Sequence, residues 1–293
     1  MPVLDQFITY LQAERRYSPL TVKAYRRDLE DCLEYLSSAY GVEDLCAMTS
    51  PMVKSFLVHL KEKGLANRSV NRMISTLKTF YKYALREGLV EKSPMFAVKN
   101  LKQPQQLVKF VSESDINKVS FENVDDYTIK RDELLFELLY QTGIRKAELI
   151  GLRDKDVDRS AMRIKVLGKR DKERYIPVGR ELLAMIDHYQ ALRDARFGGR
   201  ADRLLLNDKG EEMTPYFVYD KVHRMLAEVT TLKQKSPHVL RHTFATHLLD
   251  EGASLVAIQK LLGHTELATT QVYAHNTIEQ LKKIHQQAHP KGG

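Results

Sequence analysis

The chain has 293 residues, of which 43% are hydrophobic and 29% charged, and it carries a formal net charge of +8 with a pI near 9.2. This length suits two domains of a soluble globular protein, and the excess of positive charge suggests a polyanionic partner such as nucleic acid. The composition excludes a membrane-spanning chain, a secretory signal and a disulfide framework, because no apolar run approaches about 18 residues, Asp5 interrupts the first apolar stretch, and Cys32 and Cys46 are the only cysteines. We therefore expect a cytoplasmic protein with reduced thiols.

The first hundred residues predict a bundle of helices. Apolar residues recur at helical spacing in three stretches, within residues 3–11, 22–36 and 70–85, and the third stretch ends at Gly88, a typical left-handed helix end. Ser18-Pro19 and Ser50-Pro51 each place a hydroxyl before a proline, which predicts two helix starts capped by these serines. Residues 101–109 have few apolar side chains and three glutamines, and predict an extended linker.

Basic side chains occur along two of these predicted helices. Such a surface either binds DNA phosphates or is a solvated face, and the charge pattern alone leaves both readings open. The candidates for DNA contact are Arg26, Arg27, Arg68, Arg72 and Lys78.

After the linker the pattern becomes mixed. A buried helix is expected to end at Gly143, and residues 163–166 and 174–178 predict two short strands joined by a basic turn at 168–172. Helical patterns then cover about 181–188, 216–229, 238–249 and 255–262, with Gly252 and Gly263 as stops. The expected fold is therefore mainly α, with a helical first domain and a mixed α+β second domain that contains a small β-sheet or hairpin.

Four segments of the second half place reactive side chains next to residues that end helices, start helices or form turns. They are residues 142–149, the turn at Gly168-Lys169, residues 237–242, and residues 262–264, and the last is followed by Thr269 to His275 with Tyr273. In this order they contain Arg145, Lys169, a His238-x-x-Arg241 pair, His264 and Tyr273. The chain thereby resembles the tyrosine recombinase (phage integrase) family, and residues 16–22 and 71–81 extend the resemblance over nearly the whole length. The compact length and the residues around His238 and Tyr273 are most similar to the Xer recombinases, XerC type.

The resemblance implies a core-binding (SAM-like) DNA-binding domain over residues 1–103, a linker at 104–110, and a catalytic domain with a C-terminal tail helix over 111–293. It also implies the catalytic roles. Arginine matches phosphate geometry and stays charged, so Arg145 and Arg241 are expected to clamp the scissile phosphate, with His264 as a third donor. Tyr273 would be the nucleophile, with His238 as its general base and Lys169 as the general acid for the leaving 5′ oxygen. Glu148 would orient its neighbours.

Attack by Tyr273 would give a 3′-phosphotyrosyl linkage, and strand exchange would give a Holliday junction. The bond energy is retained and arginines neutralise the phosphate, so we expect no ATP, no metal and no other cofactor. The resemblance implies a double-stranded recombination site, a cyclic tetramer joined by the tail around 277–289, a second XerD-like recombinase and a DNA translocase as partners, and chromosome dimer resolution at cell division as the task.

Several alternatives stay open at this point. The chain could serve a mobile element or an invertible DNA segment, bind DNA without catalysis, or relax supercoils as a type IB topoisomerase. The complete series from Arg145 to Tyr273 argues against a simple binder, and the Xer-like first half and tail favour recombination. Zinc binding by His238, His242 and His247 is disfavoured because the three do not share one helix face, so His242 and His247 are expected to pack or to support the site.

Overall fold

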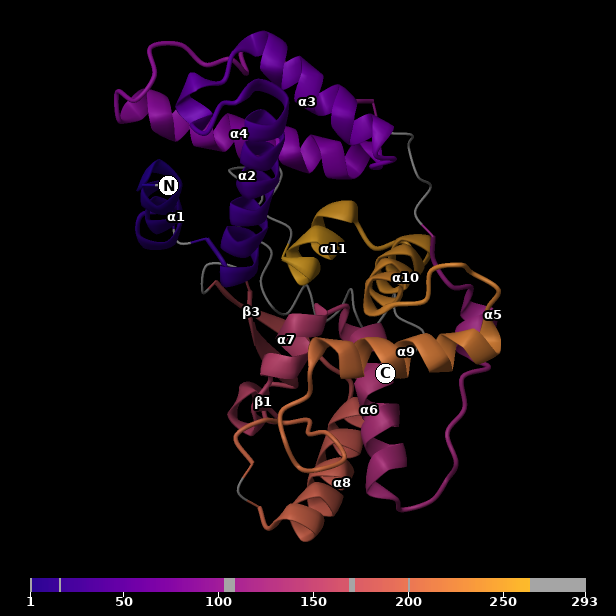
Figure 1. Cartoon of the computed structure of the whole chain (residues 1–293). Helices are drawn as coiled ribbons and strands as arrows, with labels where there is room; N and C mark the ends of the chain where they lie inside the picture. Colours follow the sequence, from indigo (N-terminus) through magenta and orange to yellow (C-terminus); the bar gives the residue numbers. More distant parts are fainter. Residues whose placement is uncertain (1, 16, 103–108, 169–171, 200, 264–293) are drawn as a thin grey trace. The chain divides into compact units, whose positions relative to one another are not determined.

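The computed structural model describes residues 2–15, 17–102, 109–168, 172–199 and 201–263. The chain divides into two compact units, Met1–Gln106 and Leu107–Gly293, each built around its own hydrophobic core. Helices dominate both units, and a small antiparallel sheet lies in the second (Figure 1). The predicted fold class, mainly α with a small sheet in the second half, is confirmed. No described helix is both long and apolar enough to cross a membrane.

The described residues of the first unit form four α-helices and one short 3-10 helix. They are α1 (Pro2–Ala13), α2 (Pro19–Tyr40), η1 (Leu45–Ala47), α3 (Ser50–Glu62) and α4 (Asn67–Arg86). The apolar faces expected from the sequence are buried, including Phe7, Leu29 and Phe80 at 0% exposure. Burying such faces supplies most of the stability of a helical unit, because isolated helices of this length are marginal in water.

One of the two predicted serine caps is correct and the other is wrong. Ser18 caps α2, since its hydroxyl accepts a hydrogen bond from the Thr21 N–H at 3.3 Å. Ser50 is instead the first residue of α3, and its hydroxyl donates to the Pro94 carbonyl at 3.0 Å. The helix begins one residue earlier than expected, so Thr49 takes the capping position, and its side chain makes no cap hydrogen bond.

The second unit contains seven α-helices in its described residues and a sheet with the strand order β1-β2-β3. Its elements are α5 (Glu113–Ile116), α6 (Tyr127–Thr142), α7 (Lys146–Gly151), η2 (Asp154–Asp156), β1 (Val157–Asp158), β2 (Arg163–Leu167), β3 (Glu173–Pro177), α8 (Arg180–Phe197), α9 (Pro215–Val229), α10 (Pro237–Asp250) and α11 (Leu255–Leu262). The predicted hairpin is present, with Arg163 opposite Pro177 and Leu167 opposite Glu173. Figure 1 shows α6 alongside α8, beneath α9 and α10.

Helix α8 is much longer than the predicted segment 181–188. Its second half looks polar in the sequence but includes Arg193, which is 1% exposed. Arg193 donates to both carboxylate oxygens of Asp154, at 2.9 and 2.8 Å, and to the carbonyl of Leu204 at 3.0 Å. A buried arginine with its donors satisfied extends the packed face beyond the apolar residues. The two-residue strand β1 was not predicted either, because it is too short to show alternation.

The ends of the linker are tied to the two units by side chains. Asn71 on α4 accepts from the Leu101 N–H at 2.7 Å and donates to the Leu101 carbonyl at 2.9 Å. In the second unit, the Val111 N–H donates to the Thr243 hydroxyl at 3.0 Å. The predicted linker at 104–110 stays a prediction, because residues 103–108 lie outside the described part of the chain.

Candidate active site

The site is built where α6, α10 and α11 come close together at Gly143. This glycine has φ +59°, and its N–H closes α6 by donating to the Leu139 carbonyl at 3.1 Å. A Cβ at this position would lie 2.4 Å from Phe244 Cδ1 of α10 and 2.9 Å from Leu262 Cδ2 of α11. Glycine is therefore required twice, by the left-handed backbone and by the lack of space.

Arg145 immediately precedes α7 and is held by Glu148 of the same helix. The Arg145 backbone N–H donates to Glu148 Oε2 at 2.7 Å, and its Nη1 donates to Oε1 at 2.8 Å. The Arg145 side chain remains 29% exposed, whereas the Glu148 side chain is only 4% exposed. Glu148 thus fixes an arginine that keeps accessible N–H groups for an anion.

Arg174 on β3 binds the other side of the same carboxylate. Its Nη1 donates to Glu148 Oε1 at 2.8 Å and its Nη2 to Oε2 at 2.9 Å, a bidentate pair. Its Nε donates to the Leu261 carbonyl at 2.8 Å. Arg174 was not among the residues predicted for the site and was expected only as part of the strand 174–178. Strand alternation was the available signal, because Arg174 lies two residues before buried Ile176 and so shares its face.

Arg241 on α10 is the most buried arginine of the group, at 5% exposure. Its Nη1 donates to the Gly143 carbonyl at 2.5 Å, and its Nη2 donates to the Leu262 carbonyl at 2.6 Å. Burial, together with the positive charge of Arg145, lowers the pKa of Arg241 to about 10. Its guanidinium therefore lies in an environment that disfavours positive charge and would gain from an anion nearby.

Three consecutive carbonyls at the end of α11 each accept from a different arginine. Arg174 donates to the Leu261 carbonyl and Arg241 to the Leu262 carbonyl, while Arg145 Nη2 donates to the Gly263 carbonyl at 3.3 Å. The carboxyl end of a helix carries partial negative charge and carbonyls without helical partners, so it suits such donors. The end of α11 therefore gathers the three guanidinium groups, and we call them the arginine cluster.

The arginine cluster has an excess of positive charge. Glu148 is the single carboxylate that Arg145 and Arg174 share within the described residues. Burial would raise the pKa of Glu148, but hydrogen bonds from Arg174 and from the Arg145 backbone outweigh it and hold the pKa below its usual range. Three arginines against one ionised glutamate leave a net charge of about +2, which suits a phosphodiester.

His238 lies in the first turn of α10, three residues before Arg241, and is exposed. Partial burial and the positive charges of His242, Arg241, Lys146 and Arg145 lower its pKa below the usual histidine value. The imidazole is therefore neutral at neutral pH, the form in which it accepts a proton.

The other two histidines of α10 have different surroundings. His247 is buried, and its Nε2 donates to the Val111 carbonyl at 3.0 Å while its Nδ1 pairs with the Tyr140 hydroxyl at 3.1 Å. Both ring nitrogens are used, so His247 packs as expected and has no lone pair for zinc. His242 is exposed and does not pack in the core, so of the two expected roles only support of the site stays a prediction.

Three predicted catalytic residues, Lys169, His264 and Tyr273, lie outside the described residues. The residues directly before Lys169 and His264, namely Gly168 and Gly263, are described. Gly168 donates its N–H to the Lys172 carbonyl at 2.8 Å across the base of the hairpin turn. Gly263 ends α11 with φ +63° directly before His264. The structure thus brings Arg145, Glu148 and Arg241 together and adds Arg174.

The candidate DNA contacts of the first unit fall into two groups. Arg26 pairs with Asp5 at 2.8 Å, and Arg72 pairs with Asp28, which is fully buried and also accepts from the Thr76 hydroxyl. Burial raises the pKa of Asp28. The remaining three, namely Arg27, Arg68 and Lys78, are exposed and make no ion pair within the described residues. Their charges are available for phosphates.

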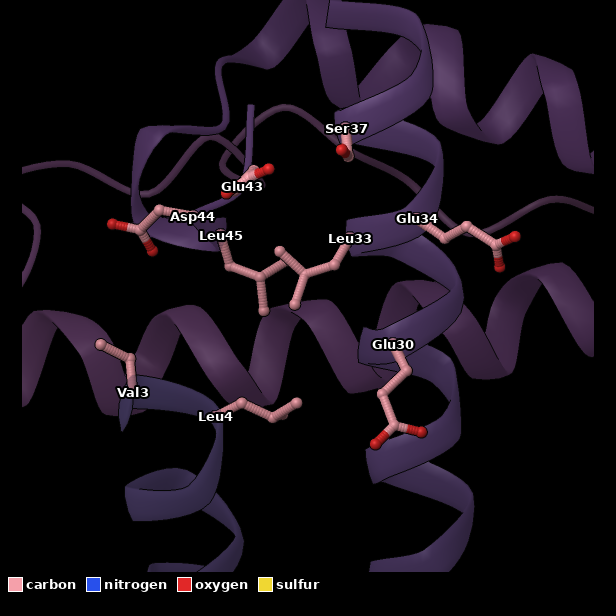
Figure 2. A pocket seen from close by; sticks show the side chains of 9 residues that line it. All are labelled: Val3, Leu4, Glu30, Leu33, Glu34, Ser37, Glu43, Asp44 and Leu45. Carbon is pink, nitrogen blue, oxygen red and sulfur yellow. The ribbon is translucent and has the colours of Figure 1, made fainter. Parts of the chain in front are cut away.

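A pocket of about 630 Å³ in the first unit has a different character. Figure 2 shows Leu4, Leu33 and Leu45 converging at its centre, with acidic side chains around them, namely Glu30, Glu34, Glu43 and Asp44. No basic residue lines this pocket. Its carboxylates would repel a phosphate backbone, so the arginine cluster remains the candidate anion site.

Comparison with known families assigns both halves of the chain. The model of the phage integrase family matches residues 104–280, and the model described as phage integrase, N-terminal SAM-like domain matches residues 4–88. A tyrosine recombinase XerC from Oceanobacillus iheyensis is 38% identical, with 98% of this chain and 96% of that protein covered. A tyrosine recombinase XerD from Listeria monocytogenes is 34% identical, with 99% of each covered.

Solved structures share the fold at lower identity. A XerH site-specific recombinase bound to a palindromic difH substrate has a TM-score of 0.72 at 22% identity, covering 96% of this chain and 82% of that one. The Tn1549 transposon integrase in complex with transposon right end DNA has a TM-score of 0.70 at 23% identity, covering 96% and 97%. The chain therefore belongs to the phage integrase family and is a tyrosine-type site-specific DNA recombinase of the XerC type.

Proposed function

We propose that Arg145 and Arg241 of the arginine cluster hold the scissile phosphate and that Tyr273 attacks it. The observation that carries this proposal is the net positive charge of Arg145, Arg174 and Arg241 against Glu148 alone. The transition state of phosphoryl transfer concentrates negative charge on the non-bridging oxygens, and donors fixed in advance stabilise it without reorganisation. Arg145 and Arg241 are the two clamp residues, and His264 adds a third donor.

The proton transfers follow from the remaining side chains. The phenol of Tyr273 has an ordinary pKa of about 10, so it needs a base at neutral pH. Neutral His238 accepts the phenolic proton as the Tyr273 oxygen bonds to phosphorus. The bond from phosphorus to the 5′ oxygen breaks, and Lys169 gives that oxygen a proton. The products are a 3′-phosphotyrosyl linkage and a free 5′-hydroxyl, and a 5′-hydroxyl from a second duplex reverses the step to form a Holliday junction.

The reaction so described needs no ATP and no metal, because a phosphodiester bond replaces a phosphodiester bond and the arginines offset the charge of the phosphate. In the first unit we assign phosphate contacts to Arg27, Arg68 and Lys78, which are exposed and unpaired within the described residues. Arg26 and Arg72 would bind phosphate from within their ion pairs with Asp5 and Asp28. The first unit would then bind the duplex while the second cuts it.

The biological role we propose is resolution of chromosome dimers at cell division, in the cytoplasm. Relatives named XerC and XerD match 98% and 99% of the chain and support this role. Strand exchange in two duplexes calls for four active sites, so we propose a cyclic tetramer on DNA that includes a second, XerD-like recombinase and is controlled by a DNA translocase. Deletion of the gene should leave unresolved dimers, visible as DNA trapped at division septa. Clear septa with loss of excision of a mobile element would assign the chain to that element instead.

The nucleophile is tested with a nicked suicide substrate that carries the recombination site. The intact protein should form a covalent adduct that survives denaturing electrophoresis, and Tyr273→Phe should form none. Tyr216→Phe is the matched control, because Tyr216 is 73% exposed on α9. This variant should cleave the substrate like the intact protein. An adduct that persists in Tyr273→Phe would refute the assignment, and the absence of any adduct on the cognate site would favour binding without catalysis.

A further inference from the structure

We infer that Arg174 is a positioning residue for DNA cleavage, which acts on Arg145 through Glu148 and fixes the hairpin strand to the end of α11. The inference rests on the proposed function, since it concerns how the phosphate clamp is held. It goes beyond the clamp itself because Arg174 lies on a strand that none of the predicted catalytic residues occupies.

The hydrogen bonds of the Arg174 side chain are made to groups of the protein itself. Its side chain is 14% exposed, and each of its three nitrogens donates to an acceptor within the protein. Two of the bonds reach Glu148, and the third reaches Leu261. Three of its five N–H groups are thus used on acceptors of the protein, and Arg174 is placed to hold these groups in position.

A continuous path of short contacts joins Arg174 to Arg145. Glu148 Oε1 accepts from both guanidinium groups at 2.8 Å, and Oε2 accepts from Arg174 and from the Arg145 backbone N–H. Without Arg174, the buried carboxylate would lose its bidentate partner. Glu148 could then turn or take up a proton, and either change would loosen the backbone and side chain of Arg145.

Arg174 also relates the hairpin to the turn before His264. A Cβ on Gly263 would lie 3.1 Å from Arg174 Cδ, so the helix end packs directly against this side chain. At the other end, a Cβ on Gly168 would lie 3.7 Å from Arg174 Nη1. One side chain therefore lies against the residue before Lys169 and against the residue before His264. Lysine cannot replace it, because a single ammonium has no planar fork for Glu148 and a separate donor for Leu261.

The test measures single-turnover cleavage of the suicide substrate by the full chain, at saturating and at limiting DNA. Arg174→Ala and Arg174→Lys are compared with Glu148→Gln and with the double variant Arg174→Ala/Glu148→Gln. Arg163→Ala is the matched control, because Arg163 lies on the neighbouring strand β2 and pairs with Asp158 at 2.9 Å, outside the arginine cluster. Far-UV circular dichroism identifies variants that remain folded, and Arg174→Lys keeps the charge and most of the volume if the alanine variant unfolds.

We expect Arg174→Ala to reduce the cleavage rate at saturating DNA by about 10–100-fold. Losses of this size are typical when a residue that orients a functional side chain is replaced. The DNA concentration at half saturation should change by less than about twofold. Arg174→Lys should recover only part of the rate, and the double variant should be no slower than its slower parent, because both changes break the same path.

Two results would overturn the inference. Cleavage by both Arg174 variants at the rate of Arg163→Ala would show that Arg174 does not support the clamp. Losses that multiply in the double variant, with weakened DNA binding, would show that Arg174 contacts DNA independently of Glu148. If neither the intact protein nor Arg163→Ala forms an adduct, the proposed function itself fails, and that outcome is distinct from both.

Discussion

Replacement of Gly143 by alanine should destabilise the second unit and impair the clamp together. The left-handed backbone at this position costs an alanine about 1 kcal/mol or slightly more relative to glycine. The new Cβ would also lie 2.4 and 2.8 Å from two atoms of the Phe244 ring and 2.9 Å from Leu262, and overpacking of a core costs about 1–3 kcal/mol. Together the two costs amount to about 2–4 kcal/mol.

Gly198→Ala separates the two contributions. Gly198 ends α8 in the same unit with φ +77°, and a Cβ there would meet no atom within 4 Å. The Gly198→Ala variant is therefore destabilised by the left-handed backbone alone. For a unit of this size, about 1 kcal/mol lowers Tm by about 2–4 °C, so Gly143→Ala should lower Tm by two to four times as much as Gly198→Ala.

Thermal unfolding is followed by far-UV circular dichroism, because the chain has no tryptophan. The Gly143 carbonyl accepts from Arg241, so cleavage of the suicide substrate should also fall in Gly143→Ala and stay unchanged in Gly198→Ala. Equal Tm losses in the two variants would refute the view that Gly143 is required by the contact of α6 with α10 and α11. Unimpaired cleavage would separate the glycine from the clamp.

Three further predictions concern charge. Because the pKa of Glu148 is lowered in the folded protein, its carboxylate stabilises the fold above the ordinary Glu pKa, and this stability is lost as the pH falls through the lowered value. The difference in unfolding free energy between the intact protein and Glu148→Gln should therefore shrink in acid. A difference that grows in acid would contradict this prediction. Because the pKa of His238 is lowered, the acid limb of the cleavage rate at limiting DNA should lie below pH 6.5 and disappear in His238→Gln, and a limb above pH 6.5 would exclude His238 as the base. Arg68→Gln should reduce the slope of log affinity against log salt by about 0.9, as expected for one lost phosphate contact. Arg86→Gln is the control, because Arg86 is not among the proposed phosphate contacts and pairs with Glu14 and Glu87, and it should leave the slope unchanged.

Local signals in the sequence were sufficient for much of the fold. The periodicity of residues 3–11, 22–36 and 70–85, the hairpin at 163–178 and the glycine stops at 143 and 263 all predicted elements that the structure contains. These signals work because helix faces, strand alternation and left-handed turns depend on residues a few positions apart. The cap predicted at Ser50 was wrong because α3 begins one residue earlier, at Ser50 itself. Helix α8 was cut short because Arg193 looks like a surface residue until its partners in the fold are known.

The sequence by itself also determined the family and predicted the chemistry, since the order of Arg145, Lys169, His238, Arg241, His264 and Tyr273 can be recognised without coordinates. Only the tertiary structure decided how the clamp is held. Arg174 and Glu148 are 26 residues apart, and Arg241 and Gly143 are 98 apart. No periodicity links residues at such separations. Their contacts form at the end of α11, where the carbonyls of Leu261, Leu262 and Gly263 accept hydrogen bonds from three arginines of the preceding chain. The carboxyl end of a helix suits such donors because its last carbonyls have no acceptor role within the helix.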